Sequence, residues 1–316
     1  MADMFTVASK EFADMVKGKR FITLIIIFGL VMTVAMATIY IQVMRMMEGI
    51  PGVAMPRGFL GLITFSLSGT MSYFAPVMGL ALGCDAISGE REKGTLKIVL
   101  VQPIFRDTVI NGKFIAAASA VSLAIVFSSM VSVGAAMILI GVTPTAEEGM
   151  RMALFLIFSI LFTMTYYGIS IFFSTILKRT SQSVILGVTT WALFTFVIPI
   201  IASLIALTMV WPIVTPGQED SVERMRNFTA IVEGISSITP NYHFGKIAQY
   251  LLNPYATTGG YLQTQPQPQP QPQPIQEAAP ITTSLIYAGP NILVLAIATM
   301  LAFFASYIVF TRQEVR

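Results

Sequence analysis

The side chains best suited to chemistry in this chain are the charged residues of one segment, residues 84–113, which lies between two long apolar stretches. Five of the nineteen Lys and Arg residues fall in this segment. Asp85, Glu90 and Glu92 are interspersed there with Arg91 and Lys93. Charges of both signs at this density can recognise a surface of complementary charge, and they belong in water rather than in hydrocarbon. The segment predicts a surface that docks a soluble partner, and we expect no catalytic residue in it.

Two short helical pieces are predicted within the segment. We expect the preceding apolar helix to continue through residues 85–93 and to stop at Gly94, because glycine adopts the left-handed conformation that ends helices. Thr95 can then cap a second helix, which Pro103 limits. The second helix is mostly apolar and includes Leu96, Val99 and Leu100. It must pack against neighbouring helix ends, a partner protein, or both; the alternative is an ordinary turn with a helix in the membrane interface.

The elements that position this segment are membrane-spanning helices. The chain is 55% hydrophobic and 11% charged, with a mean hydropathy of +0.75, which does not fit an ordinary soluble domain. A helix needs about 20 apolar residues to cross the hydrocarbon core. Six stretches are long enough: residues 21–44, 60–84, 114–141, 152–177, 184–211 and 288–310. None alternates as a barrel strand would, so the fold class is an all-α polytopic membrane protein with six transmembrane helices.

The basic residues predict the orientation. With the N-terminus in the cytoplasm, thirteen Lys and Arg residues lie on the cytoplasmic side and six on the other, three of those six in one long loop. Short loops rich in Lys and Arg stay inside. We therefore expect a multi-pass protein of the plasma membrane with both termini cytoplasmic.

The chain divides into five predicted regions. Residues 1–20 form an amphipathic interfacial helix, with Phe5, Phe12 and Val16 on one face. Residues 21–211 hold transmembrane helices one to five and the 85–113 loop. Residues 212–287 form an external loop with a small helical cap and a Gln-Pro linker at 265–274, expected to be extended polyproline II. Residues 288–311 form the last helix, and residues 312–316 a cytoplasmic tail.

Several kinds of function are not supported by the sequence. Within the six stretches there is no Asp, Glu, Lys, Arg or His, although ion-coupled transporters usually keep such groups. No GYG-like filter suggests a channel. No GxxxxGK[ST] occurs, so the chain has no P-loop for ATP. Energy for uphill movement must come from another polypeptide.

Cysteine and histidine, two common ligands of transition metals, each occur once in the sequence. The single cysteine, Cys84, is expected to be a structural thiol, and the single histidine, His243, a surface or capping residue. No metal site is predicted. Small residues four apart in the second stretch predict a close helix contact, either within the chain or in a dimer. They are Ala75, Gly79 and Gly83. Pro76 and Pro199 are expected to kink or break their helices.

The stretch GLALGCDAISGEREKGTLKIVLVQPIFRDTVINGKF resembles the hallmark of type-2 ABC exporter permeases. In that family a long second helix runs into a charged cluster, a Gly-Thr-Leu step, an apolar helix, a proline and a Gly-Lys pair. The matching positions are Asp85, Ser88, Gly89, Glu90, Arg91, Glu92, Gly94, Thr95, Leu96, Pro103, Gly112 and Lys113. The six-helix layout matches as well, and within the family the chain looks most like the branch that holds the permease of the nitrous-oxide-reductase copper-maturation system.

The resemblance implies the transmembrane subunit of an ABC exporter. It implies a cytoplasmic ABC ATPase as partner, a second permease copy (or a paralogous permease), and no cofactor on this chain, since ATP and Mg would be bound by the ATPase. The helix after Gly94 would be the coupling helix, seated in a groove of the ATPase. Leu96, Val99 and Leu100 would be its buried anchors, and the charged residues 90–93 would set its alignment against the partner. The alternative function is a membrane scaffold or sensor that docks a cytoplasmic protein and transports nothing.

Overall fold

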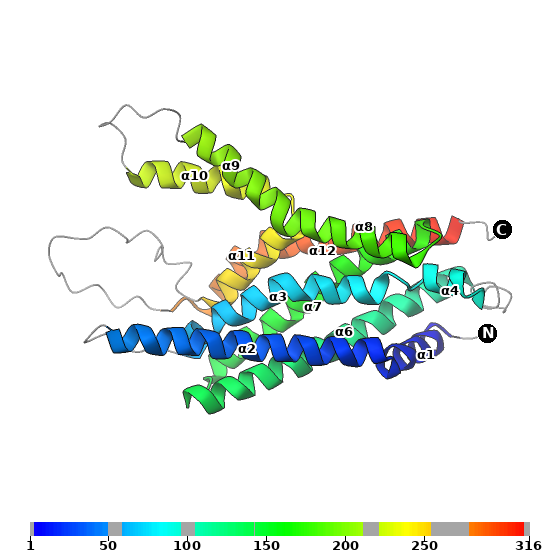
Figure 1. Ribbon diagram of the computed structural model, residues 1–316, viewed down its shortest axis with the longest axis horizontal. Coiled ribbons are helices and arrows are strands. Elements are labelled where there is room, and N and C mark those ends of the chain that lie inside the picture. Colours follow the sequence, from blue (N-terminus) through cyan, green and yellow to red (C-terminus); the bar gives the residue numbers. More distant parts are fainter. Residues whose placement is uncertain are drawn as a thin grey trace.

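The computed structural model describes residues 3–49, 59–95, 105–141, 143–210, 221–253 and 278–312, and every regular element in these ranges is a helix. The predicted all-α class is therefore confirmed. Six helical spans are long and apolar enough to cross a membrane. They are α2 (Lys19–Gly49), α3 (Phe59–Gly83) with α4 (Ser88–Glu92), α6 (Arg106–Ile140), α7 (Ala146–Ile176), α8 (Thr180–Ala192) with α9 (Ile198–Val210), and α12 (Ile281–Arg312). Figure 1 shows both chain ends at the same end of this bundle.

Helix α7 is the central helix of the bundle. It packs against α3 and α12 along its length and also contacts α6. Its buried face carries hydroxyl groups, each with a partner: Thr165 Oγ1 and Thr299 Oγ1 of α12 lie 2.7 Å apart, and the Ser170 hydroxyl donates to the Leu80 carbonyl of α3 at 2.9 Å. The hydrophobic effect is weak between helices in lipid, so hydrogen bonds between hydroxyl groups and neighbouring helices help to hold the spans together. A polar core helix is therefore compatible with a bundle in hydrocarbon.

Close contact between α3 and α7 depends on two glycines. A Cβ on Gly79 would lie 2.4 Å from the Thr163 carbonyl oxygen, and one on Gly83 would lie 2.8 Å from Ser170 Cβ. Both glycines thus face α7 of the same chain. Pro76 lies inside the continuous α3, so this proline does not break its helix.

The fifth span is interrupted. A π-helical turn, Leu193–Val197, separates α8 from α9. The turn ends two residues before Pro199 and contains Thr195, whose carbonyl, four residues before the proline, would clash with the proline ring in a regular α-helix. A π turn is one way to relieve this clash. Beyond the turn, α9 runs away from the bundle beside α10 (Ser221–Ser236) (Figure 1).

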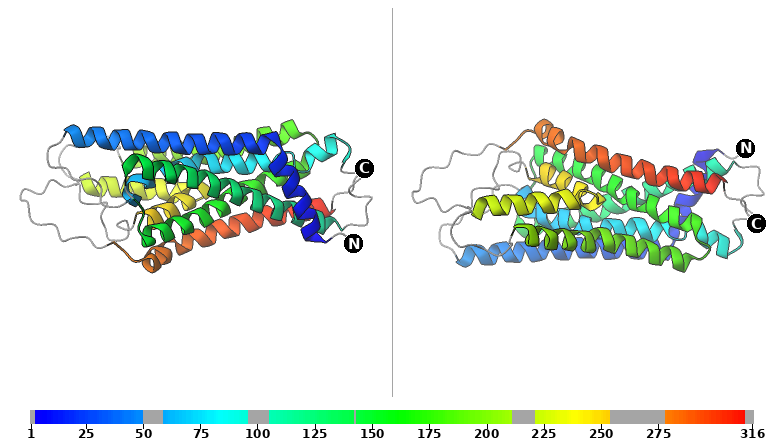
Figure 2. Two further views of the ribbon diagram at one scale, coloured as in Figure 1. Left: turned by 90° about the horizontal axis from the view of Figure 1, so that it is seen from below. Right: turned by 90° about the horizontal axis from the view of Figure 1, so that it is seen from above.

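The predicted N-terminal helix is present as α1 (Met4–Lys17). Figure 2 shows it crossing the end of the bundle obliquely. Its apolar face packs against α6, where Gly112 allows Val7 to approach: a Cβ at residue 112 would be 2.7 Å from Val7 Cγ1. Ala8 is buried, whereas Phe5 is exposed. Much of the apolar stripe is therefore covered by the chain itself.

Two helices follow the fifth span, α10 and α11 (Pro240–Leu252). Helix α11 packs among α3, α7 and α12. The ring of Phe244 stacks on that of Phe162 in α7, with centroids 4.2 Å apart. Helix α11 is thus part of the bundle rather than a surface cap. The Gln-Pro repeat at 265–274 lies outside the described residues.

Candidate functional site

The charged segment after α3 begins with a break in the helix. Helix α3 ends at Gly83, and residues 84–87 form turns before α4. Ser174 of α7 explains the break, because its Oγ accepts the backbone N–H groups of Ile87 and Ser88 at 3.0 and 2.9 Å. N–H groups at a new helix start need such an acceptor. The prediction that one helix continues through residues 85–93 was therefore wrong.

Arg91 and Glu92 of α4 bind the junction between α7 and α8. The Arg91 guanidinium donates to the carbonyls of Leu177 and Thr175 at 2.8 and 3.1 Å, which are orphan acceptors at the end of α7. The Glu92 carboxylate accepts from the Thr180 backbone N–H and hydroxyl, both at 3.0 Å, at the start of α8. A cation at a helix C-terminus and an anion at an N-terminus both complement the helix dipole. We call these four contacts the junction clamp.

A second group of charges lies between α1, α4 and α6. Lys113 is 2% exposed, and its Nζ lies 2.8 Å from Glu11 Oε2 and 2.6 Å from Glu90 Oε1. Next to it, Arg20 Nη1 lies 2.6 Å from Asp85 Oδ2. We call these five residues the inner charge cluster. Burial alone would raise the pKa of Glu11, but the Lys113 ammonium outweighs it, so that the pKa lies below its usual value.

The segment after α4 turns at Gly94. Its φ of +73° is left-handed, and its N–H donates to the Arg91 carbonyl at 3.1 Å. The predicted helix end is therefore in place, and Thr95 is already helical. The predicted anchors Leu96, Val99 and Leu100, and Pro103, lie outside the described residues, so their role against a partner stays a prediction.

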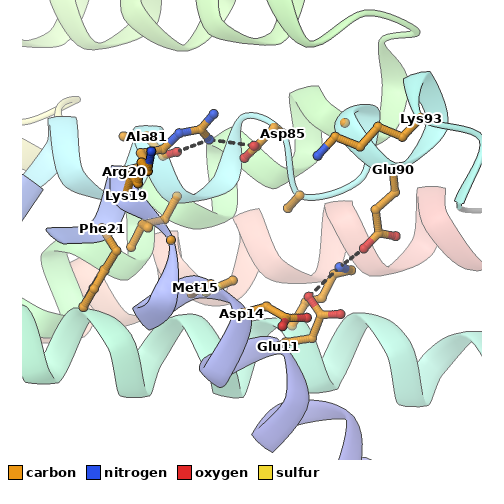
Figure 3. A pocket seen from close by; sticks show the side chains of 15 residues that line it. Glu11, Asp14, Met15, Lys19, Arg20, Phe21, Ala81, Asp85, Glu90 and Lys93 are labelled. Carbon is orange, nitrogen blue, oxygen red and sulfur yellow. Dashed lines mark hydrogen bonds and ion pairs between the residues drawn. The ribbon is translucent and has the colours of Figure 1, made fainter. Parts of the chain in front are cut away.

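A cavity of about 400 Å³ opens beside the inner charge cluster. It lies between α1, the start of α2, the end of α3, α4 and α6 (Figure 3). Its charged lining residues are Glu11, Asp14, Lys19, Arg20, Asp85, Glu90, Lys93 and Lys113. Of the charged residues predicted to face a partner, Glu90, Arg91 and Glu92 thus bind this chain itself, and Lys93 lines the cavity.

The opposite end of the bundle holds a second buried cation, Arg151 of α7, which is 1% exposed. Its guanidinium donates to Glu147 Oε1 at 2.8 Å, Ser284 Oγ at 3.0 Å and the Leu251 carbonyl at 3.3 Å, and also to the Ala279 carbonyl. Arg151 therefore joins α7 to the end of α11 and the start of α12. Sequence reasoning missed Arg151 and the partners of Lys113, because both residues fall just outside the apolar stretches.

No metal site is found in the parts of the chain that the structure describes. His243, expected to be a surface or capping residue, is buried: its ring nitrogens lie 2.9 Å from Asn291 Oδ1 and 2.7 Å from the Ser237 carbonyl oxygen. The buried Cys84 thiol, directly after the end of α3, contacts the carbonyl of Ala81 in that helix at 3.6 Å. Both positions are structural.

The sequence of this chain is similar to those of known transporter proteins. The sequence profile described as "ABC-2 family transporter protein" matches residues 5–315. A protein of Pseudomonas aeruginosa named "Probable ABC transporter permease protein NosY" is 26% identical over 161 residues, which are 49% of this chain and 52% of that protein. One of the same name from Stutzerimonas stutzeri is 27% identical over 130 residues, 40% of this chain and 42% of that protein. The chain spans about half the length of these curated relatives.

Proposed function

The chain belongs to the ABC-2 family of transporter proteins, and from this premise we propose that it is the permease subunit of an ABC exporter driven by a separate cytoplasmic ATPase. Both curated relatives bear the name of an ABC transporter permease protein. The sequence has no GxxxxGK[ST] of its own, so ATP and Mg would be bound, and ATP hydrolysed, by the partner. Both chain ends then lie in the cytoplasm.

The observation that carries this proposal is the way residues 85–95 are attached. The junction clamp ties α4 to the α7–α8 junction, and the inner charge cluster ties it to α1 and α6. Arg20, at the start of α2, holds Asp85. A partner that docks on this segment can thus act on most of the spans at once. Such rigid attachment suits a part that transmits displacement from an ATPase to the bundle.

A second permease copy is part of the proposal. The fifth span is the least buried of the six in this chain. Its exposed residues include Ile185, Ile200, Ile201 and Leu204. We propose that a second copy covers part of this face, and that cargo passes between the two copies. Among the described residues, no Asp, Glu, Lys, Arg or His lies in the middle of a span. A path without fixed charge favours an amphipathic or apolar cargo.

The test is affinity purification of the full chain from native membranes, with identification of the proteins that accompany it. A stoichiometric P-loop ATPase is expected. Gly94→Val should reduce its recovery at least tenfold, because a β-branched residue resists the left-handed conformation. Gly134→Val in α6 is the matched control, since a Cβ meets nothing within 4 Å at either position.

Equal ATPase recovery with Gly94→Val would contradict docking at this segment. A partner without a nucleotide-binding motif would instead favour the scaffold or sensor function. The double variant Leu96→Asp, Val99→Asp is expected to keep the bundle folded while transport stops and ATP hydrolysis continues. Normal transport by this variant, at normal expression, would refute the role of the two anchors.

A further inference from the structure

The cavity beside the inner charge cluster has an unusual balance of charge. Four carboxylates line it, those of Glu11, Asp14, Asp85 and Glu90, and four cations, those of Lys19, Arg20, Lys93 and Lys113. Its lining is therefore neutral overall. A free anion or a free metal cation would disturb this balance, whereas a ligand that carries one charge of each sign would preserve it.

Part of the lining has no partner within the described residues. The four carboxylates, Arg20 and Lys113 all form ion pairs. Lys19 and Lys93 form none with any described residue. Glu90 Oε2 is a buried oxygen without a hydrogen-bond partner there, although Oε1 of the same carboxylate binds Lys113. The site therefore offers two ammonium groups for an anion and one carboxylate oxygen for a donor.

The geometry brings these groups around one space. Figure 3 shows Lys93 reaching back from α4 toward Asp85, while Glu90 projects toward Glu11 across the lower side of the cavity. Lys19 enters from the start of α2. A ligand with an anion near Lys19 and Lys93 and an N–H donor near Glu90 would satisfy all three. A primary ammonium can donate this hydrogen bond, and a quaternary ammonium cannot.

The position of the cavity identifies the source of such a ligand. It lies where the amphipathic helix α1 meets the first residues of a membrane-crossing helix, which is the level of lipid headgroups. Directly after the lining residue Phe21, Ile22 and Ile26 of α2 are 49% and 62% exposed. These side chains can contact acyl chains that descend from the cavity. We propose that the cavity binds the phosphoethanolamine headgroup of a membrane lipid, with the phosphate on Lys19 and Lys93 and the ammonium on Glu90.

The experiment is native mass spectrometry of the full chain taken from nanodiscs of equimolar phosphatidylethanolamine, phosphatidylcholine and phosphatidylglycerol. The expected result is preferential retention of phosphatidylethanolamine. Lys19→Gln with Lys93→Gln should reduce that retention about tenfold. Lys17→Gln with Lys178→Gln is the matched control, because it removes the same charge from two exposed residues outside the lining, and it should retain the lipid as the wild type does.

Three outcomes would overturn the proposal. One is equal retention of the three lipids, and another is undiminished retention of phosphatidylethanolamine in the Lys19, Lys93 variant. The third comes from a second arm with free phosphoethanolamine: its capture with no lipid retained would assign the site to a soluble ligand. Because the assay measures bound lipid and not transport, its failure leaves the permease proposal intact.

Discussion

At the scale of single residues, this protein uses opposite charges to hold helix ends together. Lys113 is buried between Glu11 and Glu90, and Arg151 is buried at the other end of the bundle. Removing one partner from a buried pair is strongly destabilising, because the remaining charge is left without compensation. These residues are therefore structural requirements of the fold as well as neighbours of the proposed docking segment.

The pKa of Glu11 makes part of this stability depend on pH. Because the folded pKa lies below the ordinary carboxyl value of 4.5, the ionised group stabilises the fold above that value and loses its contribution as the pH falls through the folded pKa. We expect Glu11→Gln to lower the unfolding free energy at pH 7 by about 1.5–3 kcal/mol. The difference from wild type in thermal unfolding in detergent should shrink below about pH 4.5.

Asp14→Asn is the control for this pH series. Asp14 is on the same helix but is 66% exposed, in an ion pair with Lys10. Exposed pairs contribute little, so this variant should melt close to the wild type throughout. A wild-type advantage over Glu11→Gln that stays constant down to pH 3 would show that the carboxylate charge is not what stabilises the cluster.

At the scale of helices, the contact between α3 and α7 depends on the missing side chain of Gly79. A Cβ there would meet two backbone atoms, the Thr163 carbonyl oxygen at 2.4 Å and the Tyr167 nitrogen at 3.0 Å. Neither can move without shifting α7, so Gly79→Ala should cost about 1–3 kcal/mol by overpacking. Thermal unfolding of the purified variant checks this.

Gly69→Ala provides the comparison on the same helix. A Cβ at residue 69 meets nothing within 4 Å, and alanine favours a helix over glycine by about 1 kcal/mol. This variant should be as stable as the wild type or more so. If both alanine variants melt together, the close approach of α3 and α7 does not limit stability.

The helices themselves were largely predictable from the sequence. Apolar length identified all six spans, and the glycine signal placed the turn at Gly94. Helix ends were less predictable, because hydropathy identifies only the part of a helix that lies in hydrocarbon. For example, α6 begins at Arg106, eight residues before the apolar stretch that starts at residue 114. The break after Gly83 depends on Ser174, which is 86 residues from Ser88 in sequence. Periodicity within one segment cannot reveal such a partner.

The candidate site was predictable only in part, for the same reason. The sequence identified Glu90, Arg91 and Glu92 as a charged group, but their binding partners are Lys113, Thr175, Leu177 and Thr180. Three of these four follow α4 by more than eighty residues. Spacing predicts which face a side chain takes on its own helix, and only the packing of the bundle decides what it meets.

At the scale of the whole molecule, Arg151 holds the end of the bundle remote from the chain termini. Arg151→Met would leave the Leu251 and Ala279 carbonyls without their donor, and each unsatisfied buried group costs about 1–3 kcal/mol. We expect faster hydrogen exchange in α11 and in the first turns of α12, with unchanged exchange in residues 84–95.

Arg226→Met is the control for this prediction, because Arg226 is an exposed arginine on α10. It should leave the exchange of α11 and α12 unaltered. Uniformly faster exchange across all spans in Arg151→Met would mean that the arginine supports global stability rather than this end of the bundle.

The junction clamp has a mechanical consequence. The fifth span is held by Glu92 at the end that lies near the chain termini, and it is otherwise the least buried of the six. Its 31 residues would extend roughly 46 Å as a straight helix. If a helix of this length tilts by about 5° around its held end, the far tip, with α10 beside it, moves by roughly 4 Å. The π turn at Leu193–Val197 interrupts the span between this held end and the far tip, and its stiffness would decide how much of the displacement reaches α9.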